Sequence, residues 1–153
     1  MIGKFIKGKT LVMIDAANLE SAVKDLGWWI DYIKLKDLFD SSNLFEIRDY
    51  CVAHRTENQN NFFTFLKKNG FTLITKPLKI IKALDVERGD IRKANFDVEI
   101  TTDALQLTDT YDHFILFSGD GEFVPLVKRL RELGKSVTVI SDRKYLSGEL
   151  LLV

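Results

Sequence analysis

Short apolar runs recur along the chain and alternate with amphipathic stretches. The runs are rich in β-branched or aromatic residues and are apolar on both faces, which is typical of buried strands. They lie at residues 10–14, within 45–53, and at 71–75, 114–117 and 137–140. The pattern therefore predicts five strands that are covered on both sides.

Segments with helical spacing fall between these runs, at about residues 18–26, 57–69, 96–107 and 123–133. Gly70 and Gly134 follow two of them, where a glycine commonly ends a helix. Strands that alternate with helices of this length predict βαβ units and a parallel sheet with helices on both faces. Right-handed crossovers then favour an α/β fold, a Rossmann-like three-layer sandwich.

No repeat or composition change divides the chain, so we expect one domain over residues 1–153. The last residues, 148–153, resemble the opening of a helix that stops while still apolar. Either this element docks on the sheet as it stands, or the chain is truncated at its C-terminus.

Composition narrows the class of protein. The 153 residues carry 22 Lys plus Arg and 22 Asp plus Glu, which excludes a uniformly basic nucleic-acid-binding surface and an acidic disordered protein. Cys51 is the single cysteine, which excludes an intramolecular disulfide and fits a reducing compartment. The N-terminus lacks the apolar core of a signal peptide, and no apolar run approaches the roughly 20 residues that span a bilayer. We therefore expect a soluble cytoplasmic protein with no membrane partner.

The charges are segregated although their sum is zero. Residues 67–93 hold eight bases and three acids, whereas residues 94–127 hold seven acids and no Lys or Arg. A basic approach beside an acidic site is one interpretation, and a solvated loop beside a solvated helix is the other.

Three acids follow predicted strands or precede a predicted helix. Asp15 comes directly after 10–14, Asp120 comes shortly after 114–117, and Asp97 lies near the start of a helix. Each alone is typical of a helix cap or a turn. In open α/β sheets, however, ligands bind beyond the carboxyl ends of the strands, where such acids converge. Clustered carboxylates favour a hard cation, Mg²⁺ or Mn²⁺, which activates water and stabilises charge on a phosphate.

Other polar residues surround these acids. Asp103 follows Asp97 by six residues, about 120° around a helix and about 9 Å along it, so we expect an indirect, water-mediated role or a surface position. Ser118 stands in the segment Ser-Gly-Asp-Gly-Glu-Phe, where the glycines allow close approach of a ligand and Ser118 could bind phosphate or orient Asp120. Glu122 is either a further metal ligand or a favourable charge at a helix N-terminus.

Four segments together resemble the NYN domain, the LabA-like branch of the PIN-like nuclease superfamily. They are residues 13–19, 95–105, 118–123 and 134–139, and the similarity extends from residue 11 to about residue 152. The resemblance implies a five-stranded, mainly parallel sheet of order 3-2-1-4-5 and a metal-dependent ribonuclease. It also implies that some relatives bind RNA or proteins without demonstrated cleavage.

The same resemblance assigns residues. It places the metal cluster on Asp15, Asp97 and Asp120, adds Asp103 as a further acid, and marks Asn18 as a site residue. Where Glu122 stands, members of the family often have the shorter Asp.

The leading hypothesis is a ribonuclease that uses Mg²⁺ or Mn²⁺ and cuts single-stranded or loop RNA. Phosphate and RNA contacts are expected from Ser118, Arg55, Lys76, Lys79, Arg88, Arg92 and Lys93. The alternatives are a non-catalytic PIN-like module that binds RNA or a regulatory partner, and a small-molecule phosphatase. Trp28 and Trp29 could stack on bases or a partner or could cap the sheet edge, and a homodimer or a further domain stays open.

Overall fold

A computed structural model describes residues 6, 8–39, 43–77, 79–81, 91–93 and 95–153, with backbone only at 79–81 and 91–93. Its main sheet has five strands, β1 (Thr10–Asp15), β2 (Leu44–Ala53), β3 (Thr72–Pro77), β6 (His113–Phe117) and β7 (Ser136–Ile140). They are arranged in the order β3-β2-β1-β6-β7, and every neighbouring pair is parallel. The predicted order 3-2-1-4-5 is confirmed.

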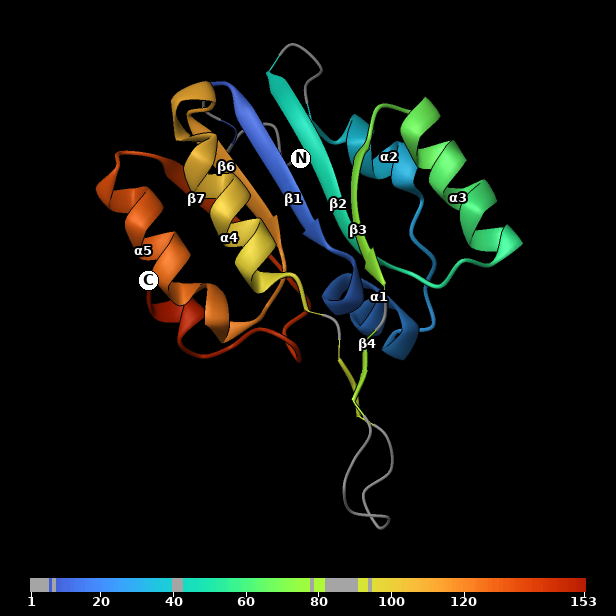
Figure 1. The fold of residues 1–153 in the computed structure, drawn as a ribbon. Helices are drawn as coiled ribbons and strands as arrows, with labels where there is room; N and C mark the ends of the chain where they lie inside the picture. Colours follow the sequence, from blue (N-terminus) through green and yellow to red (C-terminus); the bar gives the residue numbers. More distant parts are fainter. Residues whose placement is uncertain (1–5, 7, 40–42, 78, 82–90, 94) are drawn as a thin grey trace.

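Helices cover both faces of this sheet (Figure 1). On one side lie α4 (Asp97–Gln106) and α5 (Val124–Glu132), and on the other lie α2 (Tyr32–Asp37) and α3 (Glu57–Lys68). The helix α1 (Ala16–Asp25) follows β1 directly at the carboxyl edge of the sheet. The three-layer α/β arrangement predicted from the alternating pattern is therefore confirmed.

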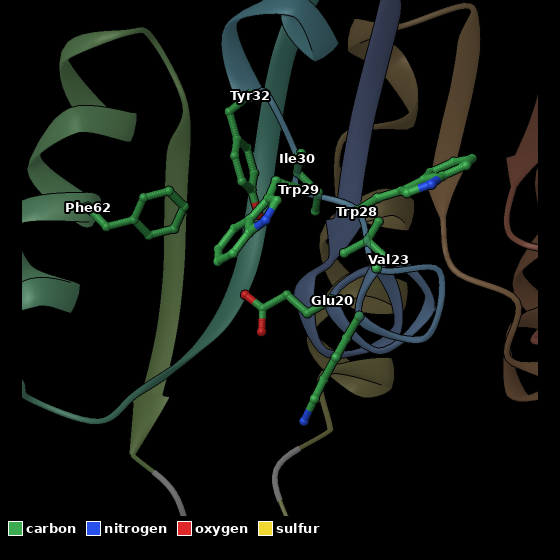
Figure 2. A pocket seen from close by; sticks show the side chains of 9 residues that line it. Glu20, Val23, Trp28, Trp29, Ile30, Tyr32 and Phe62 are labelled. Atoms are coloured by element: carbon green, nitrogen blue, oxygen red, sulfur yellow. The ribbon is translucent and has the colours of Figure 1, made fainter.

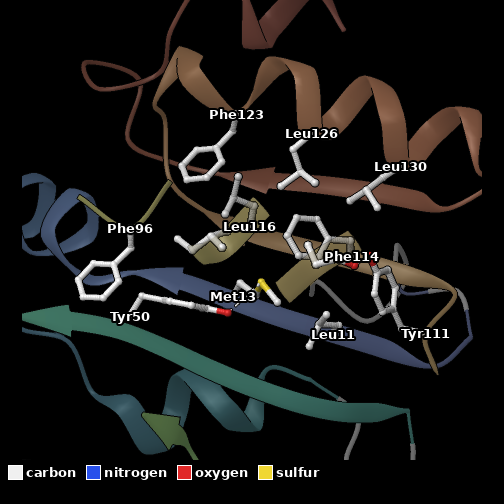
Figure 3. Close-up of a cluster of buried hydrophobic side chains, with 12 residues drawn as sticks. Leu11, Met13, Tyr50, Phe96, Tyr111, Phe114, Leu116, Phe123, Leu126 and Leu130 are labelled. Atoms are coloured by element: carbon white, nitrogen blue, oxygen red, sulfur yellow. Dashed lines mark hydrogen bonds between the residues drawn. The ribbon is translucent and has the colours of Figure 1, made fainter. Parts of the chain in front are cut away.

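Alternate residues of β1 supply two separate cores, because successive strand side chains point to opposite faces. Leu11 and Met13 pack toward α4 and α5 with Phe114, as Figure 3 shows. Val12 and Ile14 pack into the second core on the opposite face, beneath α2 and α3. All four β1 residues are fully buried. The central strand is thus held from both sides, which keeps its carboxyl end in place for the site.

Side-chain caps begin α1 and α3, and glycines follow the ends of α3 and α5. Asp15 caps α1, and the Thr56 side chain caps α3 by accepting from the backbone N–H of Gln59. Gly70 and Gly134 adopt φ values of +84° and +77° just beyond α3 and α5, which is the left-handed conformation that glycine adopts without a side-chain clash.

Three features differ from the sequence-based expectation. Six-residue α2 was not predicted, because it is too short to show a helical period. An antiparallel pair, β4 (Lys79–Ile81) and β5 (Ile91–Lys93), lies within the basic stretch. Near the C-terminus, Leu150–Leu152 forms a 3₁₀ turn. Among the described residues, no helix is long and apolar enough to cross a membrane.

Candidate functional site

The carboxyl ends of β1 and β6, together with the start of α4, surround a cavity of about 290 Å³. Asp15, Asp97 and Asp120 all line it, although they come from three distant parts of the chain. The remaining lining residues are Ala17, Asn18, Ser21, Asn95 and Tyr145. The structure thus brings together the three acids on which the metal prediction rests, and Asn18 with them.

Asp15 is held in place by both of its carboxylate oxygens. Its Oδ1 accepts from the backbone N–H of Asn18 at 3.3 Å, and its Oδ2 accepts from the Ser118 hydroxyl at 3.1 Å. The residue is only 9% exposed. Burial raises the pKa of Asp15 and outweighs the hydrogen bonds from Asn18 and Ser118, while the nearby charge of Asp120 raises it further.

A second set of hydrogen bonds fixes the loop after β6. The Asn18 Oδ1 accepts from the backbone N–H of Gly119 at 3.1 Å, which ties this loop to α1. The backbone N–H of Asp120 donates to the Ser118 hydroxyl oxygen at 3.3 Å. The Oδ1 of Asp120 accepts from the backbone N–H of Glu122 at 3.0 Å. Asn18 and Ser118 therefore act as positioning groups for the two acids beside them.

Asp97 lies at the first position of α4. Its Oδ2 accepts from the side-chain amide of Asn95 at 2.6 Å. The pKa of Asp97 is raised by burial first, then by a hydrogen bond shared with Glu122 and by the charges of Glu122, Asp120 and Asp15. Glu122 thus lies beside Asp97 without lining the cavity itself.

The three carboxylates have the chemistry that a hard divalent cation requires, and they line the same cavity. Carboxylate oxygens are the ligands that Mg²⁺ and Mn²⁺ prefer, and the described residues that line this cavity include three Asp and no Lys or Arg. In the described residues, however, no three His, Cys, Asp or Glu side chains lie close enough together to hold one ion. In this structure the Asp97 carboxylate interacts with Asn95 and Glu122.

Asp103 lies away from this cavity, on the face of α4 that covers β2. Its Oδ2 accepts from Arg48 Nη1 at 2.9 Å and from the Tyr50 hydroxyl at 2.8 Å. Arg48 also pairs with Glu46 at 3.0 Å. Asp103 lies on a different face of α4 from Asp97, as expected from the angle of about 120° between helix positions six residues apart. In this structure the Asp103 carboxylate anchors α4 to the sheet.

None of the described residues that were predicted to bind phosphate lines this cavity. Lys76 Nζ pairs with Glu99 at 2.7 Å and lies 4.4 Å from the centroid of the Phe96 ring. Arg55 is exposed and has a φ of +57°, the left-handed conformation that is uncommon for a residue other than glycine. Arg88 lies outside the described residues, as do the side chains of Lys79, Arg92 and Lys93.

Tyr145 and Asn95 are lining residues that sequence reasoning did not single out. The Tyr145 hydroxyl donates to Asp25 Oδ2 at 2.7 Å, and Lys144 Nζ pairs with the same oxygen at 2.5 Å. Asp25 ends α1, so this contact joins the segment after β7 to that helix. The sequence position of Tyr145 could have indicated a site residue, because it follows the last strand at the carboxyl edge, where ligands bind in such sheets.

The comparisons with known proteins agree over almost the whole chain. The Low amplitude and bright protein LabA of Synechococcus elongatus is 29% identical over 151 residues, which cover 95% of this chain and 80% of that protein. A crystal structure of a protein of unknown function from Vibrio parahaemolyticus matches with a TM-score of 0.77 and 28% identity, covering 95% of this chain and 88% of that one. The model of the NYN domain matches residues 9–152. The chain therefore belongs to the NYN domain family of PIN-like nucleases.

Proposed function

We propose that this protein is a divalent-metal-dependent ribonuclease that hydrolyses phosphodiester bonds in single-stranded or loop RNA. The observation that carries the proposal is the convergence of Asp15, Asp97 and Asp120 on one cavity at the carboxyl edge of the sheet. Membership of a family whose members are typically ribonucleases supports it.

In this proposal Asp15, Asp97 and Asp120 hold Mg²⁺ or Mn²⁺ between them. Such a cation supplies Lewis-acid stabilisation of phosphate charge and lowers the pKa of bound water. The chain contributes the positioning. Ser118 fixes one carboxylate oxygen of Asp15, and Asn18 holds the Asp120 loop against α1.

Binding energy for the RNA backbone would come from Arg55 and from five bases of the basic stretch, Lys76, Lys79, Arg88, Arg92 and Lys93. Each phosphate neutralised by Lys or Arg releases condensed counterions, so RNA affinity would fall steeply with added salt. Lys76 is a base of this group whose side chain is described, and it pairs with Glu99 of α4, two residues after the cavity-lining Asp97. The proposed RNA path therefore approaches the acids along α4.

The test is cleavage of a mixed panel of fluorescent single-stranded and hairpin RNAs by the purified protein with Mn²⁺. Cleavage should stop with chelator, and Asp120→Asn should lower it by about 100-fold or more while the fold is kept. Asp109→Asn is the matched control, because Asp109 is an exposed acid of the same acidic stretch, in a 3₁₀ turn outside the cavity. Cleavage by Asp120→Asn at the rate of the control would overturn the assignment.

A non-catalytic RNA-binding or regulatory module is the second candidate. The observation that favours it is that, in the described residues, the carboxylates are not gathered closely enough to hold an ion. This candidate predicts RNA binding that a chelator does not change and no turnover with any RNA of the panel. Hydrolysis of a simple phosphomonoester without RNA cleavage would instead indicate a small-molecule phosphatase.

A further inference from the structure

A second and larger cavity lies on the other side of α1. Its volume is about 720 Å³, within the range of small-molecule sites. The lining residues are Glu20, Val23, Lys24, Gly27, Trp28, Trp29, Ile30, Tyr32 and Phe62. None of them lines the cavity of Asp15, so α1 separates two independent sites.

Aromatic rings form most of one wall. Figure 2 shows the rings of Trp29, Tyr32 and Phe62 gathered between α1 and α3, with the carboxylate of Glu20 extending into the space below them. Tyr32 and Phe62 meet edge to face, with ring centroids 5.2 Å apart. Trp29 is 96% exposed, so a large aromatic face is open at the mouth of the cavity. Such faces attract cations through the ring quadrupole.

A second carboxylate lies behind this wall. Asp49 of β2 is fully buried on the same face of the strand as Ile47, and in the described residues neither of its oxygens has a hydrogen-bond partner. The charges of Asp49 and Glu20 both act on the Tyr32 hydroxyl and raise its pKa, after burial itself, so the two acids lie close to this ring. Of these two acids, Glu20 is the one whose side chain lines the cavity, beneath the aromatic rings.

The Glu20 carboxylate forms no ion pair with the other described residues, although Lys24 lines the same cavity. Lys24 lies one helical turn after Glu20, a spacing that favours an ion pair, yet the described residues include no ion pair between them. Burial also raises the pKa of Glu20, which is partly offset by the charge of His54. A positively charged group from outside would thus be stabilised by Glu20 and by the ring faces together.

We propose that this cavity binds a small organic cation that carries an ammonium group on an apolar body. The ammonium group would approach Glu20, and the apolar body would lie against Trp29, Tyr32 and Phe62. An anionic ligand is disfavoured by the Glu20 carboxylate, which also argues against an RNA phosphate here. This site is independent of the proposed nuclease function.

The test is a titration of the full chain with three probes of one shape, namely 2-phenylethylammonium, 2-phenylethanol and 3-phenylpropanoate. Binding is followed by the indole N–H signals in ¹H–¹⁵N spectra, assigned with Trp28→Phe and Trp29→Phe. The cation should bind about tenfold more tightly than the alcohol and shift the Trp29 signal, and the carboxylate should not bind. Glu20→Gln should remove the preference for the cation, whereas Glu57→Gln, at an exposed acid of α3, should keep it.

Other outcomes would overturn the proposal. Equal binding of the cation and the alcohol would show an apolar cavity without charge selection. A Trp29 signal that responds to single-stranded RNA and not to the cation would show a base-stacking surface instead. Since no readout depends on RNA cleavage, failure of this proposal and failure of the nuclease assignment are distinguishable.

Discussion

The hydroxyl of Ser118 donates to the carboxylate of Asp15 at 3.1 Å and so joins the ends of two neighbouring strands. The contact follows from the register, because Ile14 lies opposite Phe117 in the parallel pair of β1 and β6. The residues after each of these partners must then meet at the carboxyl edge. Two residues that are 103 positions apart in the sequence are thereby joined by a hydrogen bond within the candidate site.

Replacing Ser118 with Ala should weaken the site more than the fold. The variant loses two hydrogen bonds, the one donated to Asp15 and the one accepted from the Asp120 N–H, together about 2 kcal/mol of the free energy of unfolding. If Asp15 holds a cation, loss of the group that orients it should lower Mn²⁺ affinity by about 10- to 100-fold. Calorimetric titration with Mn²⁺ measures this. Ser21→Ala is the control, because the Ser21 hydroxyl lines the same cavity but donates to the Ala17 carbonyl. Equal Mn²⁺ affinity in the two variants would contradict the role given to Ser118.

Asp103→Asn should have the opposite pattern. Its carboxylate bridges Arg48 and the Tyr50 hydroxyl, so loss of the charge should cost about 1 to 2 kcal/mol of the free energy of unfolding. Mn²⁺ affinity should not change, because Asp103 does not line the cavity. Urea unfolding and the same Mn²⁺ titration separate the two effects. A loss of Mn²⁺ affinity as large as that of Asp120→Asn would instead make Asp103 part of the metal set.

The sheet could be predicted because strands buried on both faces leave a continuous apolar signal, as in residues 10–14 and 114–117. The acids at the carboxyl edge could be predicted from the same signal, since Asp15 directly follows the first of these strands. The pattern could not indicate that Asp103 lies on the face of α4 that covers β2. Its partner Arg48 lies within a strand, where a charged residue gives no sign of what it meets.

Asp49 shows the same limit more clearly. A carboxylate in a strand that pairs on both sides is expected to reach solvent, but this one is fully buried. The charge of Asp49 acts on Tyr32 of α2, a helix too short to be recognised from periodicity. The sequence pattern therefore does not predict the larger cavity, although it leaves Trp28 and Trp29 either to stack on bases or a partner or to cap the sheet edge.

Burial of Asp49 should make the stability of the protein pH-dependent. Burial, followed by the charges of Glu20 and Asp15, raises the pKa of this carboxyl from 3.8 to about 7 in the folded state. Between these two pKa values, the folded protein keeps a proton on Asp49 that the unfolded chain has lost. The contribution of Asp49 is fully present below about pH 4 and falls by about 4 kcal/mol as the pH rises from there through the folded-state pKa.

Asp49→Asn removes that titration. The free energy of unfolding of the variant, relative to the natural protein, should therefore increase between pH 4 and pH 8. Urea unfolding at several pH values measures the difference. Asp37→Asn changes an exposed acid at the end of α2 and should show no such increase. Parallel pH profiles for the natural protein and Asp49→Asn would mean that Asp49 is not desolvated as described.

Gly119 is required by close approach of the backbone and not by its own conformation. A Cβ atom there would lie 2.1 Å from the carbonyl oxygen of Tyr145 and 2.5 Å from the Ser141 hydroxyl. The Gly119 carbonyl also accepts from the backbone N–H of Ser147 at 2.8 Å. The segment after β7 is thus packed directly on the loop that carries Asp120, and it brings Tyr145 to the edge of the cavity.

Gly119→Ala should therefore push this segment outward, because a backbone oxygen cannot move aside as the end of a side chain can. We expect a loss of about 1 to 3 kcal/mol in the free energy of unfolding and faster amide hydrogen exchange at Ser147. Gly148→Ala is the matched control in the same segment, since a Cβ atom there meets no atom within 4 Å. Hydrogen exchange measured over residues 141–150 compares the two. If Gly119→Ala exchanged no faster than Gly148→Ala, the segment would not be held on the loop, and Tyr145 would have no fixed place in the site.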